Sequence, residues 1–288
     1  IFKPFLKFIT PNFIISLYKF HRIKRDLMCS KNANKMIGVI DNHWKERISS
    51  AKKSADNSLI KRVGNAGKLI KSYIVMHNGV KIYANSYYGT GMFNLLIANK
   101  GVHEPKEERI FDHIINSIDE NCIMLELGSY WGFYSLSLLQ NKPKAKCHLI
   151  EPLSDNLYCG KLNFKLNNRK GNFSSYYIDK VSNRKKNTIS VDDYCKIKKI
   201  NNVSILHSDI QGYELSMLHG AHHLLKNMKI DYLFISTHSN HIHDKCINML
   251  RFYKYNIICS TDLNETDSVD GLIVASSKLT NSPKLKLL

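Results

Sequence analysis

One stretch, Cys122–Gly132, constrains the fold of this chain most strongly. The residues up to Glu126 are apolar or compatible with a strand, Gly128 and Gly132 stand four apart, and helical periodicity begins at Phe133. This order predicts a strand, a tight glycine turn and a helix. Such a turn presents backbone N–H groups and the positive end of a helix dipole, where a nucleotide-like ligand can bind.

Downstream of this turn, apolar runs of strand length alternate with segments of helical periodicity. We expect further strands at 146–151, 172–178, 203–209, 232–238, 256–260 and 271–276. Helices are expected at 106–118, 153–166, 191–198, 212–227 and 241–253. This alternation is typical of βαβ units whose sheet is covered by helices on both faces. The sequence therefore predicts an α/β fold with a doubly wound, seven-stranded, mostly parallel, Rossmann-like sheet.

The beginning of the chain is predicted to be an extension of this fold. Residues 1–70 are basic and expected to be mainly helical, while 71–288 form the main domain. Within it we expect a hairpin cap at 71–100 and a core at 101–288. The hairpin is predicted from Asn78-Gly79, a pair that favours tight β-turns and that stands between two segments rich in strand formers.

Residues 1–25 combine six Lys or Arg with aromatic and aliphatic side chains, and they contain no acid. We expect this segment either to lie on an anionic membrane surface or to pack on the main domain, with Pro11 interrupting it. No apolar run approaches the roughly 18 residues that a membrane-spanning helix needs. Peripheral membrane contact is therefore the form of membrane association that the sequence permits.

Cysteine spacing and net charge bear on location and partners. Seven cysteines without a Cys-x-x-Cys pair or a zinc spacing indicate reduced thiols and a cytoplasmic protein. The net charge of +18 permits an anionic partner such as RNA, a membrane or an acidic glycan. Because the lysines are spread along the whole chain, a solvated surface explains the charge equally well. No nucleic-acid partner is expected.

Acidic residues that follow the predicted strands are candidates for ligand binding, because ligands of open α/β sheets lie beyond the carboxyl ends of the strands. Glu151 ends the second predicted strand and is expected to accept both hydroxyls of a ribose. The alternative is a carboxylate that caps the next helix. Asp179 follows the third predicted strand and is a weaker candidate for the edge of an adenine, since acids are common in loops.

Asp209 and His238 follow the fourth and fifth predicted strands, which are expected to be neighbours. They would then face one crevice, with His238 as a general base and Asp209 as the carboxylate that orients it. A neutral imidazole suits proton removal near pH 7, and such a base contributes about 10²- to 10⁴-fold to a rate. The alternative is that Asp209 caps the following helix and that His238 is a satisfied buried histidine.

Near His238 there are further residues of types that bind metal ions, but their spacing does not favour a metal site. His241, His243 and Asp244 follow it closely. His241 and His243 are two residues apart, so on a helix they point to different sides, and no thiolate pair assists them. No metal is predicted.

Several elements together resemble those of FkbM-type methyltransferases that depend on S-adenosylmethionine (SAM), over roughly residues 101–276. The matching elements are Glu126–Gly132, Glu151, Ile189–Asp193, Asp209–Glu214 and Gly220-Ala221. The resemblance implies SAM as cofactor and O-methylation of a hydroxyl, often on a sugar or a natural product. The cofactor-binding residues it implies here are Glu126, Gly128, Ser129, Tyr130, Gly132 and Glu151. Asp179, from its place after the third predicted strand, completes the predicted cofactor set.

Two residues depart from the pattern of that family. Tyr130 stands where the family commonly has Asn, and a tyrosine is expected to strain a left-handed turn. Gln211 replaces a Glu, so any role that needs a carboxylate at this position is in doubt.

We therefore expect a SAM-dependent O-methyltransferase that acts on a carbohydrate hydroxyl in a surface or secreted glycan. Asp209 and His238 are the predicted catalytic residues. The candidates for contact with the substrate are His103, Glu104, Trp131 and His241. The oligomeric state is not predicted.

Three other functions remain open at this stage. An RNA methyltransferase would use the positive charge, but the chain has no base-methylating motif and no platform for stacking single-stranded bases. A nicotinamide-dependent dehydrogenase would share the topology but requires a middle glycine where Tyr130 stands. A non-catalytic protein that binds glycans or membranes would bind no cofactor.

Overall fold

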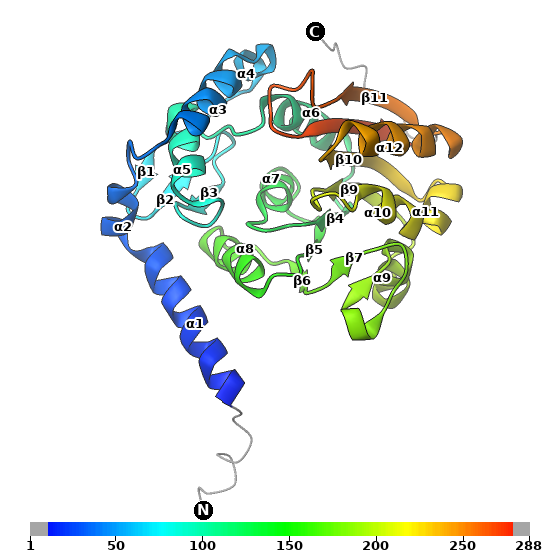
Figure 1. The fold of residues 1–288 in the computed structure, drawn as a ribbon, viewed down its shortest axis with the longest axis horizontal. Coiled ribbons are helices and arrows are strands. Elements are labelled where there is room, and N and C mark those ends of the chain that lie inside the picture. The colour runs from blue at the N-terminus through cyan, green and yellow to red at the C-terminus, as the bar shows by residue number, and fades with distance from the viewer. Residues whose placement is uncertain (1–10, 279–288) are drawn as a thin grey trace, which may run out of the picture.

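The computed structural model describes residues 11–278 and contains a central sheet of seven strands (Figure 1). Across the sheet the strands run in the order β11 (Asn256–Thr261), β12 (Gly271–Ser276), β10 (Ile230–Thr237), β9 (Val203–Ser208), β4 (Ile123–Leu127), β5 (Lys146–Ile150) and β6 (Asn172–Ser174). The five strands from β10 to β6 pair in parallel, and β12 is antiparallel to both of its neighbours. The predicted doubly wound, mostly parallel sheet is confirmed.

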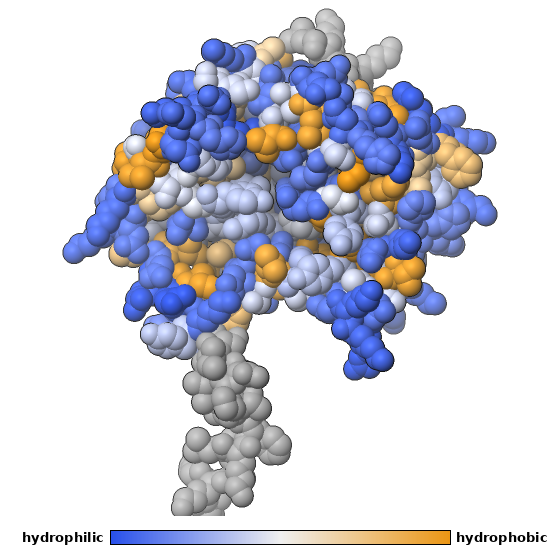
Figure 2. Space-filling view, viewed as in Figure 1, coloured by the Kyte–Doolittle hydropathy of each residue, from blue (hydrophilic) through white to orange (hydrophobic). Residues whose placement is uncertain are grey.

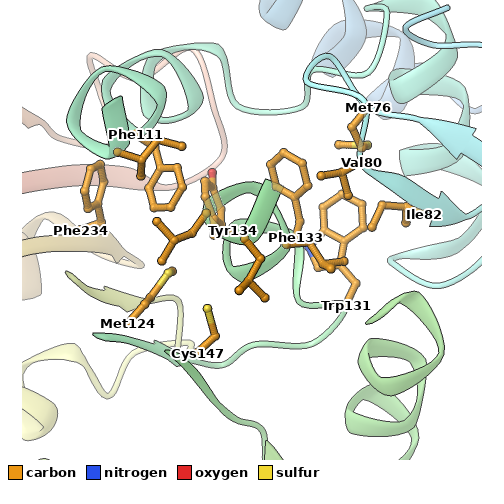
Figure 3. Close-up of a cluster of buried hydrophobic side chains, with 14 of the residues drawn as sticks. Met76, Val80, Ile82, Phe111, Met124, Trp131, Phe133, Tyr134, Cys147 and Phe234 are labelled. Carbon is orange, nitrogen blue, oxygen red and sulfur yellow. The ribbon is translucent and has the colours of Figure 1, made fainter. Parts of the chain in front are cut away.

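Helices cover both faces of this sheet. One face carries α6 (Pro105–Ser117), α7 (Phe133–Asn141) and α8 (Ser154–Leu166), and the other carries α9 (Val191–Lys198), α10 (Glu214–Gly220), α11 (His222–Lys226) and α12 (Asn240–Phe252). Alternation along β4 decides which side chain meets which layer, since Met124 packs under α6 and α7 while Leu125 packs against the opposite layer. Figure 3 shows Met124 and Phe234 of the sheet facing Phe111 of α6.

Two elements differ from the sequence prediction. The third predicted strand, 172–178, is broken: β6 ends at Ser174, and β7 (Tyr177–Ile178) pairs with β8 (Thr188–Ile189) in a separate small sheet. The backbone N–H of Tyr177 donates to the Asn187 carbonyl at 3.0 Å, so this segment leaves the main sheet.

The predicted helix at 212–227 is also broken, into α10 and α11. The carboxylate of Asp192 accepts hydrogen bonds from the backbone N–H groups of His223 and Leu224, at 2.7 and 3.1 Å. These contacts cap a new helix N-terminus. Because Asp192 lies in α9, the break depends on a tertiary contact that helical periodicity does not reveal.

The chain before the main sheet forms helices and a small antiparallel sheet. Its elements are α1 (Pro11–Met28), α2 (Ser30–Lys35), α3 (Asn42–Lys53), α4 (Ala55–Leu59), β1 (Leu69–Ile70), β2 (Tyr73–Val75), β3 (Lys81–Tyr83) and α5 (Gly89–Ala98). The predicted hairpin is confirmed: β2 and β3 pair around a turn that contains Gly79 at φ 90°. This region is joined to the main domain where the backbone N–H of Tyr83 donates to Asn163 of α8 at 3.0 Å.

The basic N-terminal segment is described only from residue 11 onward, and residues 1–10 lie outside the described part of the chain. Helix α1 begins at Pro11, a position that tolerates proline. It packs on α8, where Lys19 pairs with Asp155 at 2.8 Å and the rings of Phe20 and Tyr158 lie 4.6 Å apart. Within residues 11–278, no helix combines the length and the apolar character needed to cross a membrane.

Candidate functional site

The glycine turn after β4 forms the centre of the site. Gly128 and Gly132 both have positive φ, 72° and 73°, and a Cβ on Gly128 would lie 1.8 Å from the carbonyl oxygen of Asp209. Only glycine therefore allows the ends of β4 and β9 to approach this closely. Tyr130 has φ 35°, in agreement with the strained turn that its side chain predicts.

A cavity of about 690 Å³ lies beside this turn, at the carboxyl ends of β4, β5 and β9. Its lining includes Gly128, Tyr130, Glu151 and Asp179 of the predicted cofactor set. The other three predicted residues, Glu126, Ser129 and Gly132, are not among its lining residues. Figure 2 shows that one face of the molecule is mostly hydrophilic, with small separate hydrophobic patches.

Glu151 is held in place by backbone groups around the cavity. Its carboxylate accepts hydrogen bonds from the N–H groups of Tyr130 at 3.2 Å and Leu153 at 2.9 Å, and from the Asn156 side chain at 3.4 Å. Burial raises the pKa of Glu151, and these N–H donors oppose the rise. The residue both lines the cavity and stabilises the start of α8, so the two roles considered for it are compatible.

Glu126 lies below the turn. It is buried and accepts a hydrogen bond from the backbone N–H of Ser135, in the first turn of α7, at 3.1 Å. Burial raises the pKa of its carboxyl group. In this position Glu126 joins β4 to α7 and supports the turn rather than the cavity wall.

Four side chains form what we term the acid–histidine cluster: Asp209, Glu214, His238 and Asp270. His238 Nδ1 lies 2.8 Å from Glu214, and its Nε2 lies 3.3 Å from Asp209 and 3.4 Å from Asp270. The structure thus brings Asp209 and His238 together. Glu214 and Asp270 were not predicted, because only residues that follow strands were considered. Glu214 begins α10, and Asp270 precedes β12, which runs antiparallel to β10.

The protonation of His238 differs from the sequence prediction. Burial alone would lower the pKa of the imidazole, but hydrogen bonds to Asp209 and Glu214 outweigh it and raise the pKa to about 10. The ring is therefore charged at pH 7, and the expected neutral imidazole is not the resting form. Burial and the nearby Glu104 raise the pKa of Asp270 to about 7. Of these four side chains, Asp209 is the one that lines the 690 Å³ cavity.

Glu104, a predicted substrate contact, lies beside this cluster at the start of α6. Its Oε1 lies 3.5 Å from Arg47 and accepts a hydrogen bond from Ser268 at 3.2 Å, while its Oε2 accepts one from the Tyr134 hydroxyl at 3.3 Å. Glu104 thereby connects α3, α7 and the loop before β12.

The other predicted substrate contacts are not brought to the cavity. Trp131 is buried in the hydrophobic cluster of Figure 3, and its ring stacks on Tyr87 at 4.2 Å. His103 is also buried, with Nδ1 2.6 Å from Glu108. His241 is exposed on α12. Apolar packing and ion pairing, rather than ligand access, determine the positions of Trp131 and His103.

The structure adds aromatic residues that the sequence prediction missed. Tyr88, Tyr177 and Tyr213 line the cavity, and each remains about half exposed, at 51%, 49% and 55%. The ring of Tyr130 contacts two neighbouring tyrosines, at 5.4 Å from Tyr88 and 4.9 Å from Tyr87. The adjacent pair Tyr87-Tyr88 is the one local sequence feature that could have indicated aromatic residues at the cavity, but no periodicity connects it to the glycine turn.

Metal binding has no support in the described part of the chain. Among residues 11–278, no group of three or more His, Cys, Asp or Glu side chains is arranged to hold a metal ion.

Comparisons with known proteins agree with this architecture. Residues 98–257, more than half of the chain, match the family described as the methyltransferase FkbM domain. Among solved structures, the chain is similar to an FkbM methyltransferase from Methylobacillus flagellatus KT, with 15% identity and a TM-score of 0.47 over 65% of this chain and 54% of that chain. Among curated proteins, none matches.

Two further solved structures show a more distant similarity. Precorrin-6y C5,15-methyltransferase from Geobacter metallireducens GS-15 has 8% identity and a TM-score of 0.42, over 60% of this chain and 89% of that chain. TrmK from M. capricolum, in complex with S-adenosyl-homocysteine, has 15% identity and a TM-score of 0.39, over 58% of this chain and 67% of that chain.

Proposed function

The chain belongs to the FkbM methyltransferase family, and from this premise we propose that it transfers a methyl group from SAM to a hydroxyl of a carbohydrate in a surface or secreted glycan. Membership of the family supports a SAM-dependent methyltransferase. The proposal adds that the acceptor group is a hydroxyl and that it belongs to a carbohydrate. One observation carries it: Glu151 and Asp209 line the same cavity, so a cofactor-binding carboxylate and a proton acceptor face one space.

The residues around the cavity suit SAM. Its volume of about 690 Å³ is in the range of small-molecule and cofactor sites. Glu151 offers a carboxylate for ribose hydroxyls, and Leu153, Ile178 and Ile210 supply apolar wall for an adenine. Gly128, which also lines the cavity, lets the backbone of Asp209 approach the turn closely. When bound, SAM supplies an electrophilic methyl group on a positively charged sulfur.

Asp209 and His238 have different roles at the acceptor oxygen. The hydroxyl must lose its proton as the new C–O bond forms, and Asp209 is the cluster carboxylate that reaches the cavity. His238 is protonated and contacts Asp209 at 3.3 Å, so it orients that carboxylate rather than removing the proton itself. Glu214 accepts from the other ring nitrogen and fixes the ring. Proton removal by a positioned group is worth about 10²- to 10⁴-fold in rate.

The tyrosines at the cavity support a carbohydrate acceptor. Tyr88, Tyr177 and Tyr213 are each about half exposed. Exposed aromatic faces pack against the apolar faces of sugar rings, while their hydroxyls and nearby carboxylates bond the ring substituents.

The proposal is tested in two steps. Thermal melting with SAM, S-adenosyl-homocysteine or NAD, on wild type and Glu151→Ala, decides the cofactor. A ligand at about 100 times its Kd stabilises the fold by roughly 2.7 kcal/mol. Transfer of an isotope-labelled methyl group is then measured to methyl pyranosides, capsular polysaccharides and single-stranded RNA. Label in a sugar ether supports the proposal; label in RNA alone, or melting curves that respond only to NAD, would overturn it.

A further inference from the structure

A projection built by β7 and β8 lies beside the cofactor cavity and concentrates positive charge. Between the two strands, residues 179–187 contain Lys180, Arg184, Lys185 and Lys186, all exposed, and one acid, Asp179. Figure 2 shows strongly hydrophilic surface in the region where Figure 1 places β7 and α9. The density of positive charge here is well above that of the whole chain, which carries +18 over 288 residues.

Hydrogen bonds within the projection fix the turn that carries these cations. The side chain of Asn183 accepts from the backbone N–H groups of Lys185 at 2.9 Å and Lys186 at 3.2 Å. The backbone N–H groups of Asn183 and Thr188 each donate to the carbonyl of the other residue at 3.0 Å. Because these contacts close the turn, the backbone positions of the cations are defined relative to the cavity.

Two cavities meet at this projection. Lys186 lines the 690 Å³ cofactor cavity. Arg184, from the turn, and Lys196, from α9, line a second cavity of about 870 Å³, which we term the rim cavity. Tyr176 and Thr188 line both cavities. A ligand in the cofactor cavity can therefore extend past Tyr176 and Thr188 into the rim cavity.

Three cations are available to a ligand that takes this path: Arg184, Lys186 and Lys196, which we term the basic rim. All three are exposed, and in the part of the chain that the structure describes none of them has an ion-pair partner. One acid, Asp193, also lines the rim cavity, where its carboxylate accepts a hydrogen bond from the Ser182 hydroxyl. Positive charge therefore exceeds negative charge along the rim, and an anionic group is its complement.

The charge of the cofactor cavity has the opposite sign. Its lining includes the carboxylates of Glu151, Asp179 and Asp209. These groups suit the positively charged sulfur of SAM and repel a polyanion. An acceptor that suits both cavities is neutral at the sugar that is methylated and acidic at a neighbouring sugar. Single-stranded RNA, with a phosphate at every nucleotide, brings negative charge to both cavities and fits this arrangement less well.

An aromatic surface connects the two cavities. Tyr176 lines both of them, and the half-exposed Tyr177 beside it lines the cofactor cavity. Aromatic faces pack against the apolar faces of sugar rings. The projection thus offers rings for the sugars of a chain and cations for an acidic substituent on one of them.

We propose that the basic rim binds the carboxylate of a uronic acid in the acceptor glycan, next to the sugar that is methylated in the cofactor cavity. This rests on the proposed function, because it names the class of carbohydrate that the same cavity accepts. Asp193 offsets part of the positive charge of the rim cavity. A singly charged carboxylate therefore suits the rim better than a phosphate monoester, which carries up to two charges.

A solvated basic surface that binds no ligand is the alternative, and a matched pair of sugars decides between the two. Trigalacturonate and its methyl ester contain the same sugars and differ in charge. Their Kd values are measured by calorimetry with the full chain, in the presence of S-adenosyl-homocysteine, at low and at high ionic strength. At low ionic strength we expect the acid to bind about tenfold more tightly than the ester, a difference of about 1.4 kcal/mol. The difference should shrink at high ionic strength, because salt screens exposed charges.

A variant of the basic rim tests which cations are responsible. In the combined variant Arg184→Gln, Lys186→Gln and Lys196→Gln, the Kd for trigalacturonate should rise to that of the methyl ester, while the Kd for the ester stays as in wild type. All three positions are exposed, so the fold should be retained, and thermal melting checks this. An acid that still binds more tightly than the ester in this variant would overturn the proposal.

A second variant controls for net charge. The combined variant Lys45→Gln, Lys52→Gln and Lys53→Gln removes the same charge from exposed positions of α3, which lines neither cavity. It should bind both trisaccharides as wild type does. An equal loss of affinity for the acid in the two variants would show a general effect of net charge and would contradict a specific site.

The outcomes separate this inference from the proposed function. Equal affinity of wild type for acid and ester overturns the acidic glycan and leaves a neutral carbohydrate acceptor standing. Binding of oligouridine that is tighter than that of either trisaccharide, and is lost in the rim variant, overturns both. Where trigalacturonate accepts a labelled methyl group, the rim variant should raise its KM about tenfold with kcat unchanged, because the rim does not touch the reacting atoms. A lower kcat with unchanged KM would contradict binding of the acceptor at the rim.

Discussion

The proposed cofactor side of the 690 Å³ cavity and the proposed transfer side, the acid–histidine cluster that reaches the cavity through Asp209, are built in different ways. On the cofactor side, Gly128, Tyr130 and Glu151 come from one turn and the next strand end, and backbone N–H groups hold the single carboxylate. On the transfer side, three carboxylates share one imidazole. Fixed backbone dipoles do not titrate, but carboxylates and imidazoles do. Both sides contain carboxylates, and burial raises the pKa of Glu151 as well as that of Asp270. On the proposed transfer side, however, His238 lies within 3.4 Å of three carboxylates, so more titrating groups act on one another there.

The largest effect is expected on the cofactor side. Glu151→Ala removes the carboxylate proposed to bind two ribose hydroxyls, and hydrogen bonds to a charged group contribute about 1.5–3 kcal/mol each. The Kd for SAM should rise at least 100-fold by calorimetry. Glu151→Gln retains one acceptor and should lose less. Wild-type affinity in Glu151→Ala would remove the residue from the cofactor site.

The transfer side should respond in turnover rather than in cofactor binding. His238→Ala removes the group that orients Asp209, and we expect turnover to fall by at least about 10²-fold with the SAM Kd within a few-fold of wild type. His241→Ala, on an exposed position of α12, is the matched control and should behave as wild type. Loss of affinity with normal turnover would place His238 on the cofactor side instead.

The pH dependence of stability should show that the proposed transfer side titrates between pH 5 and pH 8. The pKa of Asp270 is raised to about 7, so its favourable contribution is complete below its unfolded-state pKa near 4 and is lost as pH rises through about 7. Asp270→Asn mimics the protonated form. Its Tm relative to wild type should therefore increase by roughly 2 °C or more between pH 5 and pH 8.

The control for this comparison is Glu265→Gln, an exposed position in the same loop. Its Tm difference from wild type should stay constant over that range. An Asp270→Asn difference that does not change with pH would show that Asp270 does not titrate between these values in the folded protein.

The smallest effect concerns backbone strain next to the transfer side. Gln211 has φ 53° and is exposed, and its side chain donates one hydrogen bond to Asp209 at 3.2 Å. Gln211→Gly should stabilise the fold by about 1 kcal/mol, because a left-handed conformation costs L-residues this much. Urea unfolding measures it. The same change at Tyr130 should not stabilise, because it removes ring contacts with Tyr87 and Tyr88.

Local patterns determined the strands and the turn. The final strand was predicted at the residues it occupies, Gly271–Ser276, because a buried strand is a continuous apolar run. Gly128 and Glu151 were found for a similar reason, since the turn and the strand end that position them are each encoded within a few neighbouring residues. The break between α10 and α11 was not found, because the cap that causes it is Asp192 of another helix.

Sequence by itself determined the sheet, the glycine turn, the proposed cofactor side of the cavity and the pairing of Asp209 with His238. Tertiary structure alone decided the charge on His238, because Glu214 and Asp270 reach it from distant parts of the chain. It also decided that Trp131 packs in the core and that Glu108 joins two buried histidines. The physical reason is common to all three: strand and helix patterns act over a few residues, whereas burial and pKa depend on every group that the fold brings within a few ångströms.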